Sequence, residues 1–394
     1  MKILILEDTS EKASLIIEQI TLIDLTIEVT LCEDVHKFTK LSSANEYHLI
    51  IVDLLVPQYA NAAPVDATDQ IIDTIRDHNC PNFRTPVIAL TSFSDAAAEN
   101  YDVLNRKDIS VITFSNDSFS WAEPLKSKII SCTPPPTYEF VIICALPKET
   151  IGFSQAGYIL GPTKVVHNFD CRELNISGAQ GVVITLPRMG LVNCAITSSR
   201  AIDLFQPKII CMSGICAGFK SRTSIYDVII SQICHQHDFG KWGENGFEPE
   251  PYSVQLLHDT ELIIKQIIAD DLFTENLGSG VNLSRSEFPP EAETLNFKVL
   301  CGPTSSGSAV IANESMSGII TDQHRKATAF EMEAFALYES ARLAAGKVDY
   351  FSAKSVVDNG DNHKGDNYHR VACILAARTT HEIISKLIKT KYCS

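Results

Sequence analysis

Residues 330–361 read FEMEAFALYESARLAAGKVDYFSAKSVVDNGD. Apolar and small residues recur at helical spacing through 335–344, which predicts a helix that stops at Gly346. The apolar run 350–357 then predicts a buried strand that ends on Asp358. Because the carboxyl ends of strands in an open parallel α/β sheet line the ligand crevice, Asp358 is a candidate for chemistry.

The same stretch places Glu331, Met332 and Glu333 at the mouth of the predicted helix. An acid in a first helical turn is usually a cap that complements the helix dipole, and capping is the favoured interpretation of Glu331 taken alone. An unpaired buried carboxylate is expensive, so Glu333, beside an apolar helix, is expected to have partners such as sugar hydroxyls. The alternative for Asp358 is that it only begins a turn.

The composition is that of a globular protein of two domains. The chain has 394 residues, of which 45% are hydrophobic. No apolar run reaches the roughly 18 residues of a membrane span, and Met1 leads into a strand, so we expect a cytoplasmic protein with no membrane partner. The 12 cysteines form no CxxC pair. A net charge of −15 argues against nucleic acid as a partner.

The clearest domain boundary is a run of three prolines, 134–136. Consecutive prolines continue neither a helix nor a central strand, and they form a stiff spacer. The expected organisation is therefore a first domain at 1–132, a linker at 133–137 and a second domain at 138–394.

The first domain alternates predicted strands and helices, and polar side chains follow three of its strands. Glu7 and Asp8 follow the first strand, Asp53 follows the third and Thr91 follows the fourth. These residues are expected on one rim of a parallel sheet, where three carboxylates would bind a hard cation such as Mg²⁺. The Thr91 hydroxyl would hydrogen-bond a phosphoryl group on Asp53. The strands are expected at 2–6, 28–31, 48–52, 86–90 and 111–114, with helices at 10–20, 69–77 and 95–104.

The segments ILILED, LIIVDLLVP and VIALTS of this domain resemble the metal pair, phospho-acceptor strand and switch strand of response-regulator receiver domains. The resemblance implies a flavodoxin-like (βα)5 fold, with Asp53 as phospho-acceptor, Thr91 as switch residue and Mg²⁺ held by Glu7, Asp8 and Asp53. It also implies a histidine kinase or phosphotransfer protein as partner.

One position departs from the receiver pattern. That family carries a Lys just after the fifth strand, where this chain reads Thr113-Phe114-Ser115-Asn116. Since a cation there normally steadies the acyl phosphate, phosphorylation of Asp53 is expected to be altered, short-lived or replaced by another input. The alternative is a degenerate receiver used only for docking or dimerisation.

The second domain is also predicted to be α/β, and its strands again lead into candidate site residues. The strand 140–145 is followed by Lys148 and Glu149, the strand 182–186 by Arg188, Met189 and Gly190, and the strand 208–212 by Ser213 and Gly214. Glycine allows close approach of the backbone to a ligand. The segment 240–252 is expected to be a loop, and 256–273 a helix.

Six segments, ALPKE, LPRMGLVNCA, MSGICAG, CGPTSSGS, FEMEAFA and KSVVDNGD, resemble in order and spacing the nucleoside phosphorylase and nucleosidase superfamily. The likeness implies its α/β fold with a central mixed sheet, and N-glycosidic chemistry without a cofactor. It implies that Glu149 activates water, that Met332 and Glu333 hold the ribose, and that Asp358 protonates the purine. Phe330 and Glu331 would flank the base.

The chemistry of the reaction agrees with this resemblance. Breaking a ribosyl C–N bond develops positive charge on the sugar and negative charge on the base, so the site needs an acid at the base and water opposite it. Burial and mutual repulsion of three carboxylates are expected to raise at least one pKa, which would help Asp358 to hold a proton. Phosphorolytic relatives hold phosphate with an Arg and a Ser or Thr, where this chain has Met212 and Ile215. Water is therefore the expected nucleophile.

The pairing of the two domains resembles the effector family of the Detocs phage-defence phosphorelay, which implies hydrolysis of ATP to adenine and ribose 5′-triphosphate. A triphosphate needs cations, and the candidates near the motifs are Lys148, Arg188, Lys354, Lys364 and Arg370. The alternatives are a methylthioadenosine/S-adenosylhomocysteine nucleosidase and a sensor that binds a nucleotide without cleaving it. The superfamily resemblance also implies a homo-oligomer.

Overall fold

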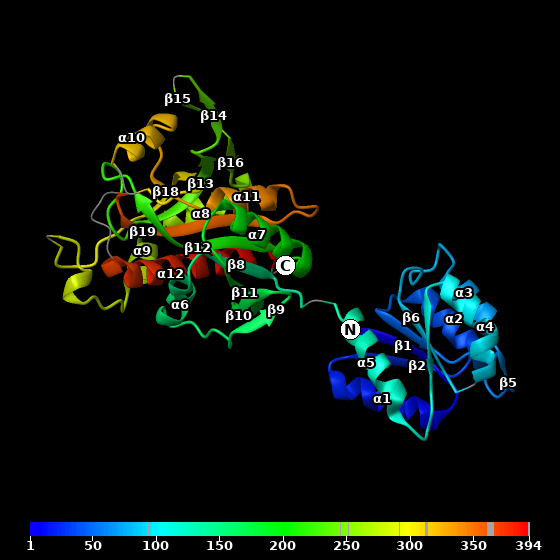
Figure 1. Cartoon of the computed structure of the whole chain (residues 1–394). Helices are drawn as coiled ribbons and strands as arrows, with labels where there is room; N and C mark the ends of the chain where they lie inside the picture. Colours follow the sequence, from blue (N-terminus) through cyan, green and yellow to red (C-terminus); the bar gives the residue numbers. More distant parts are fainter. Residues whose placement is uncertain are drawn as a thin grey trace. The chain divides into compact units, whose positions relative to one another are not determined.

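The structure is a computed structural model of the chain. It describes residues 1–92, 94–134, 136–244, 246–250, 252–290, 292–311, 314–360 and 366–392. The chain divides into two compact units, Met1–Pro135 and Pro136–Ser394 (Figure 1). No helix among the described residues is long and apolar enough to cross a membrane.

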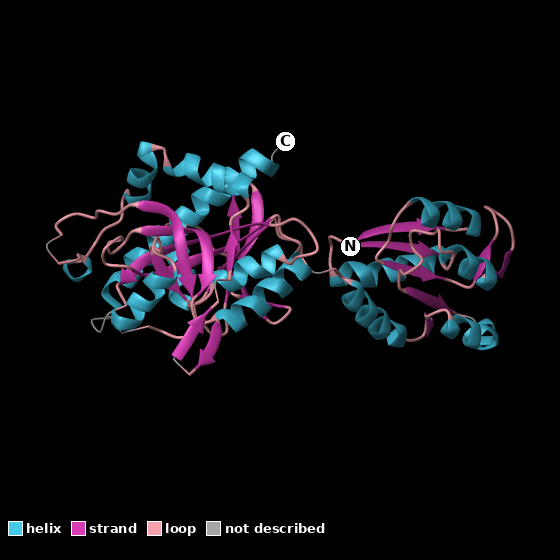
Figure 2. Ribbon diagram, turned by 90° about the horizontal axis from the view of Figure 1, so that it is seen from above, coloured by secondary structure: helices cyan, strands magenta, loops and turns pink. Residues whose placement is uncertain are grey.

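The N-terminal unit is built on five parallel strands in the order β2-β1-β3-β6-β7. This is the 2-1-3-4-5 order of one common doubly wound class. Figure 2 shows helices on both faces of this sheet. The elements are β1 (Lys2–Leu6), α1 (Ser10–Ile23), β2 (Glu28–Cys32), α2 (Val35–Ala44), β3 (Leu49–Val52), β4 (Leu55–Pro57), β5 (Pro64–Asp66), α3 (Thr68–Ile75), β6 (Val87–Thr91), α4 (Ser94–Arg106), β7 (Ile109–Thr113) and α5 (Ala122–Cys132).

The apolar strands explain why this sheet is covered on both faces. In β1, Leu4 and Leu6 pack into one hydrophobic cluster, whereas Ile3 and Ile5 pack into another. Successive side chains of a strand point to opposite faces, so a continuous apolar run needs a layer of helices on each side. The polar residues that follow β1 and β3 are thereby left at the carboxyl rim of the sheet.

The C-terminal unit is built on a mixed ten-stranded sheet, in which β12 is central and pairs in parallel with β8 and β19. The elements are β8 (Phe140–Cys144), α6 (Pro147–Gln155), β9 (Lys164–Val166), β10 (Phe169–Ile176), β11 (Ala179–Thr185), α7 (Leu191–Phe205), β12 (Ile209–Gly218), β13 (Val228–Gln236), β14 (Gly240–Gly243), β15 (Gly246–Pro249), β16 (Ser253–Gln255), α8 (His258–Ile268), α9 (Asp271–Gly278), β17 (Val299–Ser306), α10 (Glu314–Gln323), β18 (Ala329–Glu331), α11 (Ala334–Arg342), β19 (Asp349–Asp358) and α12 (His369–Leu387).

Three parallel strands of this unit end side by side. The register pairs Met212 of β12 with Ile143 of β8 and Gly214 of β12 with Lys354 of β19. Beyond a bulge at Cys216, Ala217 lies beside Asp358. The carboxyl ends of β8, β12 and β19 therefore open on a common edge, where ligand sites of parallel sheets are found.

Two predictions for this unit were wrong in detail. The segment 240–252 is not only loop, because β14 and β15 form a hairpin in which the rings of Trp242 and Phe247 lie 5.4 Å apart. The predicted helix 256–273 is two helices, because the Asp270 side chain accepts a hydrogen bond from the Leu272 N–H and begins a new helix.

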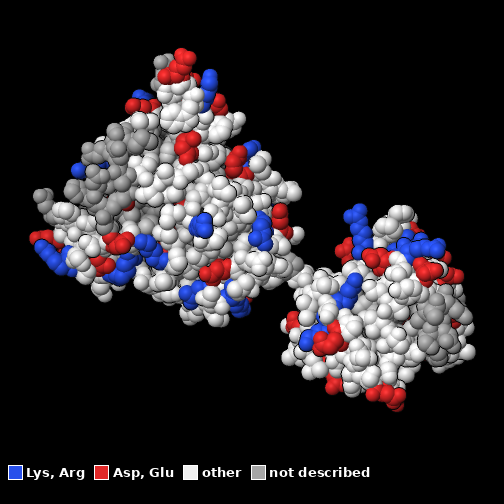
Figure 3. All heavy atoms as spheres, viewed as in Figure 1, with Lys and Arg blue, Asp and Glu red and all other residues white. Residues whose placement is uncertain are grey.

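Surface charge is mixed on both units. On the face shown in Figure 3, Lys and Arg side chains lie among Asp and Glu side chains. Among the described residues of that face there is no extended basic surface of the kind that binds nucleic acid.

Candidate active site

One cavity of about 380 Å³ opens at the carboxyl ends of β8, β12 and β19. Its wall contains all three carboxylates predicted to be catalytic, Glu149, Glu333 and Asp358. The same wall contains Met332, Glu331, Phe330, Met189 and Lys148. Residues from four distant parts of the sequence thus meet around one space large enough for a small ligand.

Glu149 is held at the start of α6 by two backbone donors. Pro147 begins this helix, and the Glu149 carboxylate accepts hydrogen bonds from the Leu146 N–H at 2.9 Å and from the Ile215 N–H at 3.0 Å. Burial raises the pKa of Glu149 to about 7; Lys354 opposes this shift and Glu333 adds to it. The group can therefore take up or release a proton near neutral pH.

Gly214 leaves the space that the Glu149 carboxylate fills. A Cβ built at Gly214 would lie 2.3 Å from Oε1 of Glu149, which is far inside van der Waals contact. The glycine predicted to allow a close approach to a ligand therefore allows a close approach to a side chain of the site.

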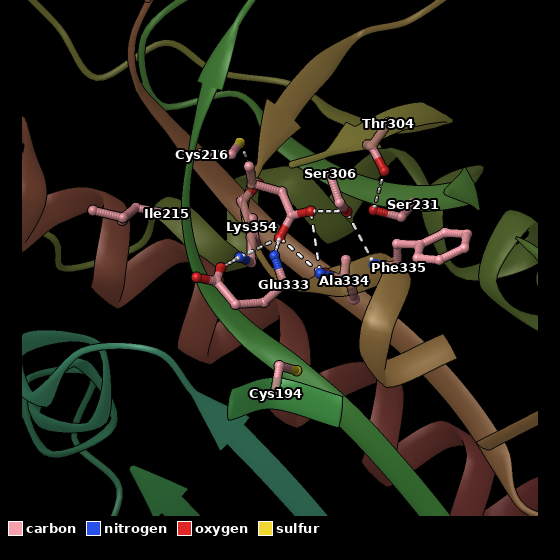
Figure 4. A network of polar contacts seen from close by, with 12 residues as sticks. Cys194, Ile215, Cys216, Ser231, Thr304, Ser306, Glu333, Ala334, Phe335 and Lys354 are labelled. Carbon is pink, nitrogen blue, oxygen red and sulfur yellow. Dashed lines mark hydrogen bonds and ion pairs between the residues drawn. The ribbon is translucent and has the colours of Figure 1, made fainter. Parts of the chain in front are cut away.

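The buried ammonium of Lys354 lies beside Glu333, as Figure 4 shows. The Lys354 Nζ lies 2.5 Å from Glu331 Oε2 and 2.7 Å from Glu333 Oε2, and all three side chains are at most 5% exposed. Burial alone would lower the pKa of Lys354, but Glu331, Glu333 and Glu149 outweigh it and hold the pKa well above its usual value. Lys354 is therefore charged at neutral pH.

Glu331 caps α11, which confirms the capping interpretation. Its carboxylate accepts hydrogen bonds from the Glu333 N–H at 2.9 Å, from the Ala334 N–H and from the Ser306 hydroxyl. Burial alone would raise the pKa of Glu331, but Lys354, Ser306 and these amides hold it below its usual value. Glu331 is an ionised anchor that fixes the first turn of α11.

Contacts to both carboxylate oxygens of Glu333 fix the orientation of its side chain. Oε2 contacts Lys354, and Oε1 accepts a hydrogen bond of 2.9 Å from the N–H of Gly190. Gly190 has a φ of 113° at the N-cap of α7, a conformation that glycine adopts without strain. The Gly190 N–H thus supports Glu333, and of residues 188–190 it is Met189 that lines the cavity.

Asp358 lies at the end of β19, half-buried, and one of its oxygens accepts a hydrogen bond of 2.7 Å from the Gly360 N–H. Gly360 has a φ of 70°, and a Cβ there would lie 2.4 Å from the ring of Phe330. The Phe330 ring also packs against Phe219, with ring centroids 5.2 Å apart. Asp358 and Phe330 are therefore fixed together on the cavity wall.

Most of the basic residues that were predicted to bind substrate phosphates do not line the cavity. Lys354 is buried with Glu331 and Glu333, which does not fit the prediction that it contacts substrate phosphates. Arg370 is held by Glu287 through contacts of 2.6 and 2.8 Å. Arg188 is exposed and does not lie on the cavity wall. Ser213, which was predicted to bind substrate, is buried and does not lie on the wall either. Lys364 is outside the described residues.

Among the predicted cations that the structure describes, Lys148 is the one that lines the cavity. Its Nζ lies 2.5 Å from His369 Nδ1 and 3.2 Å from Asp366 Oδ1, and both partners also line the cavity. Burial and Lys148 lower the pKa of His369, which favours the neutral imidazole. The Asp366 side chain is 86% exposed, so its ion pair with Lys148 is weak and open to exchange for another anion.

Sequence reasoning missed several wall residues. His369 begins α12, and Ala309, Val310 and Ile311 follow the motif CGPTSSGS of β17 directly. Residues 309–311 could have been predicted from the sequence, because residues that follow a motif at a strand end lie at the same edge of the sheet.

The predicted acidic site of the N-terminal unit contains a lysine. The Lys12 Nζ lies 2.7 Å from Glu7 Oε2 and 2.6 Å from Asp53 Oδ2. Asp8 is half-buried beside them, and Thr91 is fully buried at the end of β6. An ammonium between two carboxylates occupies the oxygens that Mg²⁺ would need, and no group of metal-ligating side chains was found among the described residues. This arrangement does not fit the predicted Mg²⁺ site.

Known proteins resemble the chain over different lengths. The sequence profile of the phosphorylase superfamily matches residues 139–389. An uncharacterized protein, y4jS, of Sinorhizobium fredii is 25% identical over 98% of this chain and 100% of its own length. ATP nucleosidase Cap17 of Escherichia coli is 24% identical over 52% of this chain, and the match spans 41% of that protein.

The fold of the C-terminal unit is also similar to solved structures. One is the 5′-methylthioadenosine/S-adenosylhomocysteine nucleosidase of Neisseria meningitidis in complex with methylthio-immucillin-A, with a TM-score of 0.50. The superposition covers 63% of this chain and 99% of that one at 17% identity. At that identity the likeness concerns the fold alone.

The raised pKa of Glu149 predicts how pH changes stability. Between the ordinary glutamate value of 4.5 and about 7, the folded chain holds a proton at Glu149 that the unfolded chain releases. Stability of the C-terminal unit should therefore fall as pH rises through this window, by roughly 3 kcal/mol. The fall should be absent in Glu149→Gln and present in the exposed control Glu244→Gln, measured by calorimetric unfolding at several pH values. An identical pH dependence in the wild type and Glu149→Gln would contradict the assignment.

Proposed function

This chain belongs to the phosphorylase superfamily as an N-glycosidic bond hydrolase, and we propose that its C-terminal unit cleaves ATP to adenine and ribose 5′-triphosphate in defence against phage. The observation that carries the proposal is the single cavity lined by Glu149, Glu333 and Asp358. The choice of ATP is supported by the likeness to ATP nucleosidase Cap17 and by the cation Lys148 on the cavity wall.

Each of the three acidic side chains has a distinct task in this mechanism. Asp358 donates a proton to a ring nitrogen of the purine as the bond from C1′ to the base breaks, and the electron pair of that bond leaves with the base. Glu333 accepts hydrogen bonds from the ribose hydroxyls and stabilises the positive charge that develops on the sugar. Glu149 takes a proton from the water whose oxygen bonds to C1′.

The surroundings of Glu149 suit water better than phosphate as the nucleophile. The N–H of Ile215 already donates to Glu149, and Met212 is fully buried and apolar. A phosphate dianion placed here would be repelled by the Glu149 carboxylate. A water molecule is neutral and can donate a hydrogen bond to it.

The second candidate function is cleavage of methylthioadenosine or S-adenosylhomocysteine. It is favoured by apolar wall residues, among them Leu146, Met189 and Ile215, which suit a thioether tail. The two candidates differ at the 5′ end of the ribose, where ATP carries charge and the thioether does not.

Release of adenine tests the proposed function directly. Purified protein incubated with ATP, ADP, AMP and methylthioadenosine should release adenine fastest from ATP, as measured by chromatography. Asp358→Asn should reduce the rate by about 10²- to 10⁴-fold, the range that a general acid supplies. Asp170 gives the matched control, because Asp170→Asn removes an exposed carboxylate of β10 that is not on the cavity wall. Adenine release that survives Asp358→Asn would contradict the catalytic assignment.

Lys148 provides a separate test of substrate class. If it binds the 5′-phosphates, Lys148→Ala should lower kcat/KM for ATP by about tenfold or more, the value of a charge-assisted hydrogen bond. The same variant should leave kcat/KM for methylthioadenosine nearly unchanged. Lys164→Ala, which removes an exposed cation that pairs with Glu173, is the control. Equal losses for both substrates would contradict a phosphate role.

For the N-terminal unit we propose a receiver function that gates the nucleosidase. A histidine kinase or phosphotransfer protein would transfer a phosphoryl group from a histidine nitrogen to a carboxylate oxygen of Asp53. The proposal is supported by the 2-1-3-4-5 strand order and by the position of Asp53 directly after β3. Control of the nucleosidase by the N-terminal unit would explain why the two units occur in one chain, since uncontrolled hydrolysis of ATP would harm the host.

Gating predicts a response to phosphodonors that depends on Asp53. Adenine release by the wild type should change severalfold on addition of acetyl phosphate or of the phosphorylated partner. Asp53→Asn should show no change, because it lacks the acceptor oxygen. Asp34→Asn, at the N-cap of α2, controls for general effects of losing a buried carboxylate in this unit. The same response in wild type and Asp53→Asn would contradict gating through this residue.

A further inference from the structure

The side chain of Lys12 is buried in the acidic site of the N-terminal unit. Lys12 lies in the first turn of α1, and its side chain is 5% exposed. Its ammonium donates a hydrogen bond of 2.6 Å to Asp53 Oδ2 and forms an ion pair of 2.7 Å with Glu7 Oε2. A lysine is seldom this buried unless its charge is matched, and here two carboxylates match it.

The other oxygens of the two acids also have partners. Asp53 Oδ1 accepts a hydrogen bond of 2.7 Å from the Leu54 N–H, and Glu7 Oε1 accepts one of 3.0 Å from the Thr9 N–H. Burial raises the pKa of Glu7, and Lys12 opposes that shift. Glu7 Oε2 is buried without a hydrogen bond, so its contact is the ion pair with the Lys12 ammonium.

An aromatic ring also lies beside this ammonium. The Lys12 Nζ lies 5.4 Å from the ring centroid of Phe114, the residue just after β7, and that ring packs on Trp121 at 5.0 Å between centroids. Phe114 belongs to the segment in which no lysine follows the fifth strand. The cation of this site therefore comes from α1, and the segment after the fifth strand supplies a ring whose face attracts it.

We propose that Lys12 is a built-in cation that occupies the place of a divalent metal in this acidic site, so that Asp53 is held there without Mg²⁺. The ammonium neutralises one of the charges of Glu7 and Asp53, with Asp8 nearby, and its hydrogen bond uses Asp53 Oδ2. A metal ion could bind only after displacing a buried, paired ammonium, which would lose both partners. The proposal is independent of the chemistry in the C-terminal unit.

Metal titration of the full chain tests the proposal. The wild type, free of nucleotide, is titrated with MgCl₂ by calorimetry and with Mn²⁺ by electron paramagnetic resonance. We expect no binding by the wild type at millimolar Mg²⁺. We expect Lys12→Met, which keeps the length of the side chain without its charge, to gain at least about tenfold in affinity, because two carboxylates lose their counter-ion. This gain should vanish in Lys12→Met/Asp53→Asn, and the exposed control Lys37→Met should behave as the wild type.

Thermal unfolding provides a second test in case Lys12→Met is less stable than the wild type. Mg²⁺ should raise the Tm of the N-terminal unit in Lys12→Met but not in the wild type, since a ligand stabilises the state that binds it. Mg²⁺ binding by the wild type that is lost in Asp53→Asn would overturn the proposal whether or not Lys12→Met folds. A folded Lys12→Met chain that gains no affinity for Mg²⁺ would also overturn it.

Discussion

The contact of Lys354 with Glu331 and Glu333 is the interaction on which the C-terminal site depends. Three side chains that are each nearly inaccessible to water carry two negative charges and one positive charge at separations of 2.5 and 2.7 Å. Burying either glutamate alone would cost several kcal/mol, and the pairing removes most of that cost. It lets the Glu333 carboxylate line the ligand cavity, where in the proposed mechanism it accepts hydrogen bonds from hydroxyls and stabilises a cationic sugar.

The fold places this cluster where it can act. β18 and α11 bring Glu331 and Glu333 to the cavity, β19 brings Lys354 beneath them and Asp358 beside them, and α6 brings Glu149 across from them. Backbone amides of Ile215 and Gly190 orient Glu149 and Glu333. The site is thus held by rigid elements and by a second layer of hydrogen bonds, which is the arrangement that precise chemistry requires. The two glutamates differ in environment, because Glu333 contacts the ammonium directly, whereas Glu149 is held by amides and has a raised pKa.

Strand-end reasoning on the sequence identified the carboxylates but not their counter-ions. Asp53, Glu149 and Asp358 follow apolar strands, and that local signal is enough to place each at the carboxyl edge of a sheet. The partner of a charge is a matter of tertiary packing, which local sequence does not contain. Lys354 was therefore taken for a ligand of substrate phosphates, and Lys12 was not recognised at all. The hairpin of β14 and β15 was missed for a related reason, since it is defined by backbone pairing between residues 240–243 and 246–249.

A double-mutant cycle between Lys354 and Glu333 tests the central claim most directly. The free energy of unfolding of the C-terminal unit is measured by urea denaturation for the wild type, Lys354→Met, Glu333→Gln and the double variant. If the buried ammonium pairs with Glu333, Lys354→Met should cost about 3–5 kcal/mol, because it leaves two buried carboxylates without a counter-ion. Glu333→Gln should cost less, because Lys354 and Glu331 remain paired, and in the double variant it should offset part of the cost of Lys354→Met, so that the two effects are strongly non-additive. Additive effects of the two substitutions would show that the pair is not coupled, and would contradict the account of how this site is built.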